Sequence, residues 1–118
     1  MQYMLLIYED ESTYSGEAGA AALRDIGARH GAFAAQLGPR LVSGAGLKGP
    51  DTATTVRNAG GKQVMHDGPF AEAKEQLGGF YIVDVPDLDA AIEIARMIPM
   101  TQDGSVEIRP LLDGAGGA

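Results

Sequence analysis

The chain has 118 residues, 45% of them apolar and 21% charged, which is the composition of a single folded domain and excludes a disordered chain or two separate cores. Nine basic and sixteen acidic residues give a net charge of −7, and because there is also no basic run, we expect no nucleic-acid partner. The lack of cysteine excludes disulfides and thiolate chemistry, and the longest apolar run is too short for a membrane span or a signal peptide, so we expect a cytoplasmic protein with no membrane partner.

The first predicted element is a strand over residues 2–9 with apolar side chains on both faces. Its odd-numbered residues, Tyr3 to Ile7, point to one side, and its even-numbered residues, Met4 to Tyr8, point to the other. A strand of this kind needs a cover on each face.

A long helix is predicted next, from the N-cap residue Ser15 to about Leu37, where Gly38 and Pro39 end it. Apolar residues at spacings of three and four form one stripe along it, with a histidine in the middle: Leu23, Ile26, His30, Phe33 and Leu37.

Gly27 and Gly31 lie beside this stripe. Each glycine inside a helix costs about 1 kcal/mol relative to alanine, so either a close approach or an open space would explain them. Neutral drift in a glycine-rich chain is the alternative.

A glycine-weakened strand is predicted over residues 41–47, followed by two strands over residues 54–57 and 63–66. The last two are joined through Gly60-Gly61, which is a hairpin signal.

The hairpin leads directly into Asp67-Gly68-Pro69-Phe70. Aspartate before Gly-Pro favours a turn in which the carboxylate accepts a backbone N–H, while Pro69 fixes its own φ. We expect this turn to place Phe70 in the core and to carry the chain into the next strand.

That strand is predicted over residues 79–85, again with two apolar faces. A second helix begins at Pro86-Asp87 and stops at Pro99, and its expected buried stripe comprises Leu88, Ala91, Ile92, Ala95 and Ile98. A last short strand covers residues 105–109, so the predicted domain spans residues 1–112, with a frayed tail over 113–118.

The order strand-helix-strand, twice, predicts the α+β class in its ferredoxin-like, split βαβ form: an antiparallel sheet with two helices on one face. The second face of the central strands would then expose a large apolar patch. A homodimer that packs sheet on sheet covers this patch, and we expect one.

With these elements laid out, the chain resembles the YCII-related family, in the branch named for its Asp-Gly-Pro-Phe motif, and thus the dimeric α+β barrel superfamily. The matching segments run nearly end to end: residues 3–8, 44–47, 53–57, 67–75, 78–81 and 104–110. One departure is Ala73, where relatives usually carry threonine.

The resemblance implies a ferredoxin-like subunit, a dimer and a cleft between helices and sheet. A histidine and an aspartate are the proposed active site of YCII-like proteins, and His30 and Asp67 match them here. Many members of this branch are encoded beside extracytoplasmic-function sigma factors, which implies a functional link to such a factor.

His30 is the first candidate for chemistry, because an imidazole with a pKa near 6.5 exchanges protons at neutral pH. A histidine that is simply packed in the core is the alternative. Asp67 either orients and charge-stabilises His30 or only caps its own turn, and the two roles are compatible.

Four further residues are candidates for substrate binding. Lys74, among glutamates, binds an anionic group or belongs to a solvated helical face. Tyr8 and Tyr81 supply phenolic hydrogen bonds or pack in an interface. Arg57 pairs with a carboxylate or lies across the hairpin.

The spacing of His30, His66 and Asp67 matches no metal motif, and Gly44-Ala45-Gly46 opens no helix after a strand, so we expect neither a metal nor a cofactor. Two classes of function stay open. The first is a small-molecule cleft in which His30 and Asp67 serve a cofactor-independent enzyme of the lyase or isomerase type. The alternative is a non-catalytic protein: a dimer that binds a metabolite or accompanies a sigma factor, or an interaction module with no ligand and no concave pocket.

Overall fold

The computed structural model describes residues 1–112, so the predicted tail, residues 113–118, lies outside the described residues. The elements in chain order are β1 (Gln2–Asp10), α1 (Gly16–Leu37), β2 (Leu41–Gly46), β3 (Thr54–Ala59), β4 (Lys62–Asp67), β5 (Glu75–Asp84), α2 (Leu88–Met97) and β6 (Ser105–Pro110). Short 3₁₀ turns cover Glu11–Tyr14, Gly38–Arg40 and Pro50–Thr52.

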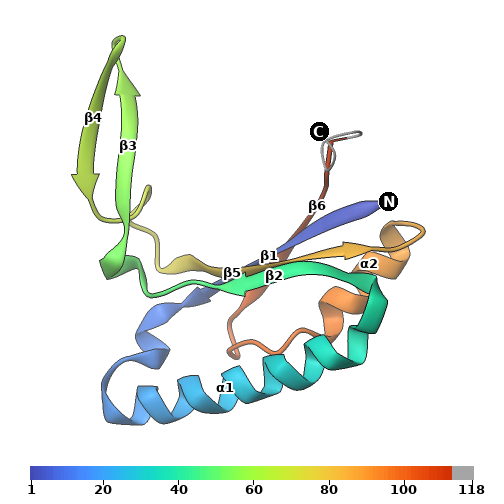
Figure 1. Ribbon diagram of the computed structural model, residues 1–118. Coiled ribbons are helices and arrows are strands. Elements are labelled where there is room, and N and C mark those ends of the chain that lie inside the picture. Colours follow the sequence, from blue (N-terminus) through green and yellow to red (C-terminus); the bar gives the residue numbers. More distant parts are fainter. Residues whose placement is uncertain (113–118) are drawn as a thin grey trace.

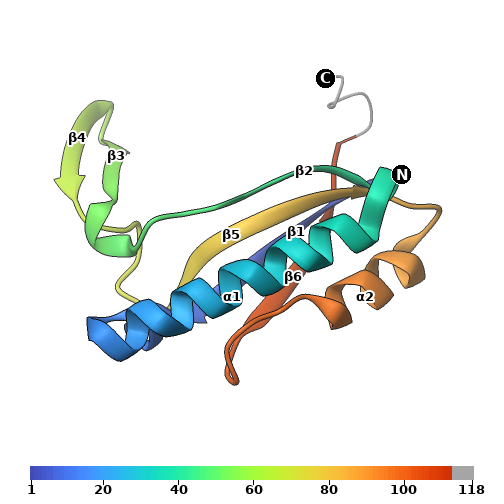
Figure 2. The ribbon, with the colours of Figure 1, turned by 60° about the horizontal axis from the view of Figure 1, so that its bottom comes forward.

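The main sheet has the strand order β2-β5-β1-β6, and every neighbouring pair in it is antiparallel. Strands β1 and β5 are central, and along the chain each of them leads into a helix, β1 into α1 and β5 into α2. Figure 2 shows α1 and α2 side by side on the same face of this sheet. The predicted ferredoxin-like fold is confirmed.

Both central strands alternate between a core face and an open face. On β1, the buried residues that face the helices are Tyr3, Leu5 and Ile7, and the half-buried residues between them are Met4, Leu6 and Tyr8. On β5, Tyr81 and Val83 are buried, while Phe80 and Ile82 lie half-buried on the open face. The predicted two-faced pattern of these strands is confirmed.

The helices cover the core face with most of the residues that their spacing predicts, with three exceptions: Leu23, Leu88 and Ile92, the last of which is only half-buried. In α1, Ile26, Phe33 and Leu37 are buried, but Leu23 is 53% exposed and lines a cavity between the helix and the sheet. In α2, Ile94 is fully buried in place of the predicted Leu88, which lies in the exposed first turn.

The caps of α2 are those that the sequence predicts. The Asp87 carboxylate accepts the backbone N–H of Ala90 at 2.9 Å, which satisfies one of the free donors of the first turn. The helix stops at Met97, before Pro99. None of the helices in residues 1–112 is long and apolar enough to cross a membrane.

Strands β3 and β4 form a separate two-stranded hairpin that rises from the sheet on the side away from α1 (Figure 1). Its turn is Gly60-Gly61, with φ angles of 59° and 82°, the left-handed values that a two-residue hairpin turn requires. The predicted hairpin is confirmed.

The prediction that Phe70 lies in the core is wrong: its side chain is 75% exposed, with the Arg57 guanidinium 5.1 Å from its ring centre. The turn before it is tied to the projecting hairpin instead, since the N–H of Gly68 bonds to the Ala53 carbonyl and the Thr55 hydroxyl donates to the Gly68 carbonyl. An aromatic ring that follows this turn is therefore held away from the sheet.

Candidate functional site

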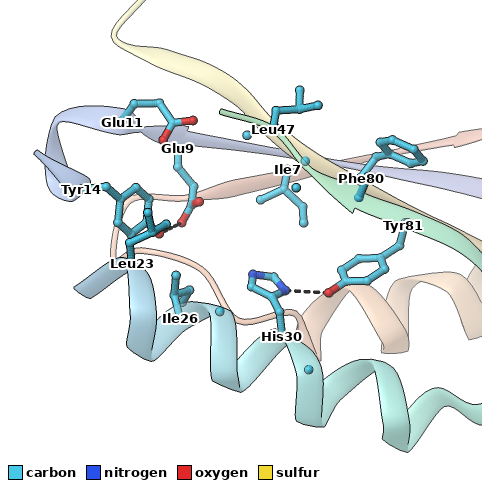
Figure 3. Close-up of a pocket in the computed structure, with 17 residues that line it drawn as sticks. Ile7, Glu9, Glu11, Tyr14, Leu23, Ile26, His30, Leu47, Phe80 and Tyr81 are labelled. Carbon is cyan, nitrogen blue, oxygen red and sulfur yellow. Dashed lines mark hydrogen bonds between the residues drawn. The ribbon is translucent and has the colours of Figure 1, made fainter. Parts of the chain in front are cut away.

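A cavity of about 400 Å³ lies between α1 and strands β1, β2 and β5 (Figure 3). This volume is within the range of about 300–1,000 Å³ that small-molecule sites usually have. Its larger apolar wall residues are Ile7, Leu23, Ile26 and Leu47, whereas Phe80 borders it from the strand with its ring on the open face of the sheet. Its polar side chains are Glu9, Glu11, Tyr14, His30 and Tyr81.

Glycines create the space in this cavity. Gly27 and Gly31 of α1 line it, and a Cβ atom built on either would have nothing within 4 Å. Of the two explanations that the sequence leaves open for these glycines, open space is the one found.

A third glycine shapes the opposite wall. A Cβ atom on Gly44 of β2 would lie 2.7 Å from Cδ1 of Tyr81, so only glycine leaves room there for the Tyr81 ring. The lack of a side chain at Gly44 thereby allows the Tyr81 ring, which starts from β5, to lie against β2 and point toward α1.

His30 and Tyr81 meet in the cavity wall. The distance between Nδ1 of His30 and the Tyr81 hydroxyl is 2.7 Å, and their ring centres are 5.8 Å apart. Phe33 packs edge-on against Tyr81 at 5.3 Å between ring centres, and Tyr81 is only 8% exposed. The phenol is thus held in one orientation by packing on one side and by the imidazole on the other.

The surroundings favour the neutral forms of both rings. Burial lowers the pKa of His30 below its ordinary value, against the opposing effects of the Glu9 charge and of a backbone hydrogen bond to Pro99, while Arg29 lowers it further. Burial also raises the pKa of Tyr81. Because the neutral phenol carries an O–H for which Nδ1 is the acceptor at hand, we assign the imidazole proton to Nε2, and Nδ1 then accepts from the Tyr81 O–H.

Glu9 lies at the other end of the cavity, and its side chain is only 6% exposed. Its Oε2 atom accepts two hydrogen bonds, from the Tyr14 hydroxyl at 3.0 Å and from the backbone N–H of Thr101 at 2.6 Å. Burial, followed by the hydrogen bond to Glu9, raises the pKa of Tyr14, so the phenol stays protonated as a donor.

Glu11 lies beside Glu9 in the same wall. Burial raises the pKa of its carboxyl group, and the negative charges of Glu9 and Asp10 raise it further. The cavity therefore has an acidic end, an apolar middle and a His30–Tyr81 pair.

The sequence interpretation missed Glu9, Glu11 and Tyr14 as site residues. One signal for Glu9 was present, because the alternation of Tyr3, Leu5 and Ile7 continues to residue 9 and places it on the helix side of the sheet.

Of the six predicted site residues, the structure brings together two, His30 and Tyr81. Asp67 and Lys74 line a second pocket of about 430 Å³ with Asp10, whose carboxylate lies 4.0 Å from Nζ of Lys74. Within residues 1–112, the Asp67 carboxylate has no hydrogen bond to His30, whose side-chain partner is Tyr81.

The other two predicted residues lie outside both pockets. Arg57 is on the hairpin, over the Phe70 ring. Tyr8 lies on the open face of the sheet, where its hydroxyl is 3.4 Å from the Glu107 carboxylate. Among the described residues, no group of three His, Asp or Glu side chains is arranged to hold a metal ion.

Comparison with known proteins agrees with the fold. The family model of the YCII-related domain matches residues 1–114. The uncharacterized protein R00369 of Rhizobium meliloti (strain 1021) is 43% identical over 123 aligned positions, which cover 94% of this chain and 92% of the relative. The finer placement in the Asp-Gly-Pro-Phe branch stays a prediction. On the extent of these matches, the chain belongs to the YCII-related family.

Proposed function

We propose that the cavity between α1 and the sheet binds a small molecule, and that His30 is the acid–base residue of a cofactor-independent reaction of the lyase or isomerase type. The observation that carries this proposal is the 2.7 Å contact between Nδ1 of His30 and the Tyr81 hydroxyl in the wall of a 400 Å³ cavity. A neutral imidazole held in this way is ready to accept a proton at neutral pH.

The Tyr81 oxygen and the imidazole form a short path for that proton. When the phenol oxygen takes a proton from a bound molecule, its own proton passes to Nδ1, and His30 becomes an imidazolium. Glu9 stabilises this charged form, because its carboxylate is among the groups that raise the pKa of His30. The reverse sequence returns the proton to another atom of the same molecule, as an isomerisation requires.

In this proposal Tyr81 takes the place that the sequence interpretation gave to Asp67 as the partner of His30. A catalytic role for Asp67 stays a prediction, and no contact with His30 supports it. The same holds for the proposed link to a sigma factor, which no feature of the cavity tests.

Solvent exchange tests the reaction without knowledge of the substrate. Pools of small metabolites are incubated with the protein in D₂O, and ¹H NMR follows the loss of individual C–H signals. We expect at least one signal to disappear with the wild type and to persist with His30→Gln and with Tyr81→Phe. His66→Gln is the matched control, because His66 is an exposed hairpin residue, and it should exchange like the wild type.

If a metabolite binds at the cavity and none exchanges, the protein is a binding protein, and the enzyme proposal is wrong. Thermal stabilisation by the same pools identifies such binding, since a ligand of the folded state raises the unfolding temperature.

We further propose a homodimer that covers the open face of the sheet. Support comes from the half-buried apolar side chains of that face, Met4, Leu6, Phe80 and Ile82, which a second copy would remove from water. Light scattering of Leu6→Glu should give a monomer, whereas Leu88→Glu, on the exposed start of α2, should behave like the wild type. A wild-type monomer at micromolar concentration would refute the dimer.

A further inference from the structure

The acidic end of the cavity contains a carboxylate oxygen that belongs to a buried residue and has no hydrogen-bond partner among residues 1–112. Oε2 of Glu9 accepts the two hydrogen bonds from Tyr14 and Thr101, but within residues 1–112 the other oxygen, Oε1, accepts none. The Glu9 side chain is more than nine-tenths buried, and in Figure 3 its free oxygen points into the cavity. This oxygen is open to the cavity, so a donor for it must come from water or from a ligand in the cavity.

Glu11 brings a second carboxylate to the same place. A Cβ atom on Gly78 would lie 3.1 Å from Oε1 of Glu11 and 3.7 Å from Oε1 of Glu9, so both oxygens gather over this cavity-lining glycine. Gly78 has no side chain that could fill the space between them. Two converging acceptors are therefore open toward the same part of the cavity.

No basic side chain neutralises this pair in the part of the chain that the structure describes. The ion pairs found there join Met1 to Asp84, Lys74 to Asp10, and Arg96 to Glu93. Two partly buried carboxylates without a cation repel each other, and the higher pKa of Glu11 agrees with this repulsion. A cation supplied by a ligand would relieve it.

The other walls of the cavity indicate the chemical character of the rest of the ligand. Between the acidic end and the His30–Tyr81 pair, the cavity is lined by Ile7 and Ile26, with Leu47 at its rim. A hydrated metal ion would leave these apolar surfaces uncovered, whereas an organic cation with an apolar body would cover them.

We propose that the cavity binds a small amphipathic amine, with its ammonium group between Oε1 of Glu9 and Oε1 of Glu11 and its apolar body against Ile7 and Ile26. The inference rests on the proposed small-molecule site and adds the chemical class of the ligand. It also places the apolar body between the carboxylates and His30, so that the end of the ligand away from the amine faces the Tyr81 oxygen.

Three probes with the same ring and different polar groups test the charge preference: 2-phenylethylamine, 2-phenylethanol and 3-phenylpropionate. Each is titrated into ¹⁵N-labelled protein at about pH 7, where the amine is a cation and the carboxylate an anion. The backbone amides of the cavity glycines report binding at the site: Gly27, Gly31, Gly44, Gly46, Gly78 and Gly79. We expect the amine to shift these amides with a Kd at least about tenfold lower than that of the alcohol, because hydrogen bonds to a charged acceptor are the stronger ones. The propionate should be the weakest.

Variants assign the preference to the two carboxylates. Glu11→Gln and Glu9→Gln should each bring the Kd of the amine close to that of the alcohol. Glu17→Gln is the matched control: it removes the same charge from an exposed position in the first turn of α1 and should leave the preference unchanged. Should Glu9→Gln fail to fold, because it ties Tyr14 and Thr101 together, Glu11→Gln carries the comparison alone.

The outcomes separate this inference from the proposed function. If all three probes shift the cavity glycines with similar Kd, or if the propionate binds best, the small-molecule site stands and the amine inference is overturned. If none of the probes shifts these glycines, both are overturned. An amine preference that persists in Glu11→Gln and Glu9→Gln reflects the overall negative charge of the protein and also overturns the inference.

Discussion

The side chains of His30, on the long helix, and Tyr81, on a central strand, are joined by a 2.7 Å contact across the cavity that separates these two elements. The contact links residues 51 positions apart in the sequence, and it holds both rings in the cavity wall.

Removal of the Tyr81 hydroxyl should free the imidazole. Tyr81→Phe keeps the packing against Phe33 but deletes the donor to Nδ1, so we expect a loss of about 1 kcal/mol in the free energy of unfolding. The ¹⁵N shifts of the imidazole should show the Nε2–H form in the wild type and a mixture of tautomers in the variant. An Nδ1–H form in the wild type would contradict our assignment of Nδ1 as the acceptor.

The charge of Glu9 should be visible in the titration of His30. NMR titration of the wild type should give a His30 pKa below its ordinary value of 6.5, because burial disfavours the imidazolium. Glu9→Gln removes a charge that raises this pKa, so the His30 pKa should fall further. Glu107→Gln, on the open face of the sheet, should leave it unchanged. A rise in Glu9→Gln would refute the proposed role of Glu9.

Protonation of His30 should also reduce stability. Its folded-state pKa lies below the unfolded value, so the unfolded chain binds the proton more readily, and stability falls as the pH drops below about 6.5 toward the folded pKa. Urea unfolding at several pH values in this window should show that the free energy of unfolding falls less with decreasing pH in His30→Gln than in the wild type. An equal fall in both proteins would mean that the imidazole is not shielded from water.

Glu11 should act with the opposite sign. Its folded-state pKa is raised above 4.5, so the wild type loses stability as the pH rises from this value through the folded pKa. Glu11→Gln removes that loss, and its stability relative to the wild type should be greater at neutral pH than in acid. Urea unfolding at the two pH values measures the difference, and an equal effect at both would show that Glu11 is fully solvated.

Alanine substitutions at two glycines of α1, Gly31 and Gly19, should change the stability of the protein in opposite directions. Gly31→Ala meets open space and removes a weak helix former, so it should stabilise the protein by about 0.5–1 kcal/mol. Gly19→Ala, three turns earlier in α1, would place its Cβ against the Tyr14 backbone and should destabilise it. Thermal unfolding of the two variants checks the contrast, and a similar loss in both would mean that Gly31 does not border a cavity.

Much of the fold was predictable because its signals are local. The Gly60-Gly61 turn, the Asp87 cap and the alternation of β1 each lie within a few residues, and local geometry decides them. Strand β5 begins at Glu75, four positions before the predicted start. Its first residues pair with the end of β1, and this pairing depends on tertiary contacts that the local sequence does not show.

The site was less predictable, because it depends on distances between elements. His30 and Tyr81 were candidates for separate reasons, and nothing in the spacing shows that they touch. Glu9 resembled the start of an acidic surface turn, since Asp10 and Glu11 follow it, and only the packing of α1 shows that it is buried. Phe70 was expected in the core because an aromatic ring after a turn is usually buried, but its turn is attached to an arm that leaves the sheet.

That arm, the β3–β4 hairpin, pairs with no strand of the main sheet in the described chain. A two-stranded hairpin is only marginally stable by itself in water, so its backbone hydrogen bonds can open while the core under α1 and α2 stays closed. In hydrogen exchange the molecule should therefore behave as two cooperative units of unequal stability. Asp67 and Gly68, at the base of the arm, lie on the boundary between the two units. Opening of the arm would therefore change the shape of the second pocket, which these residues line, while the core stays folded.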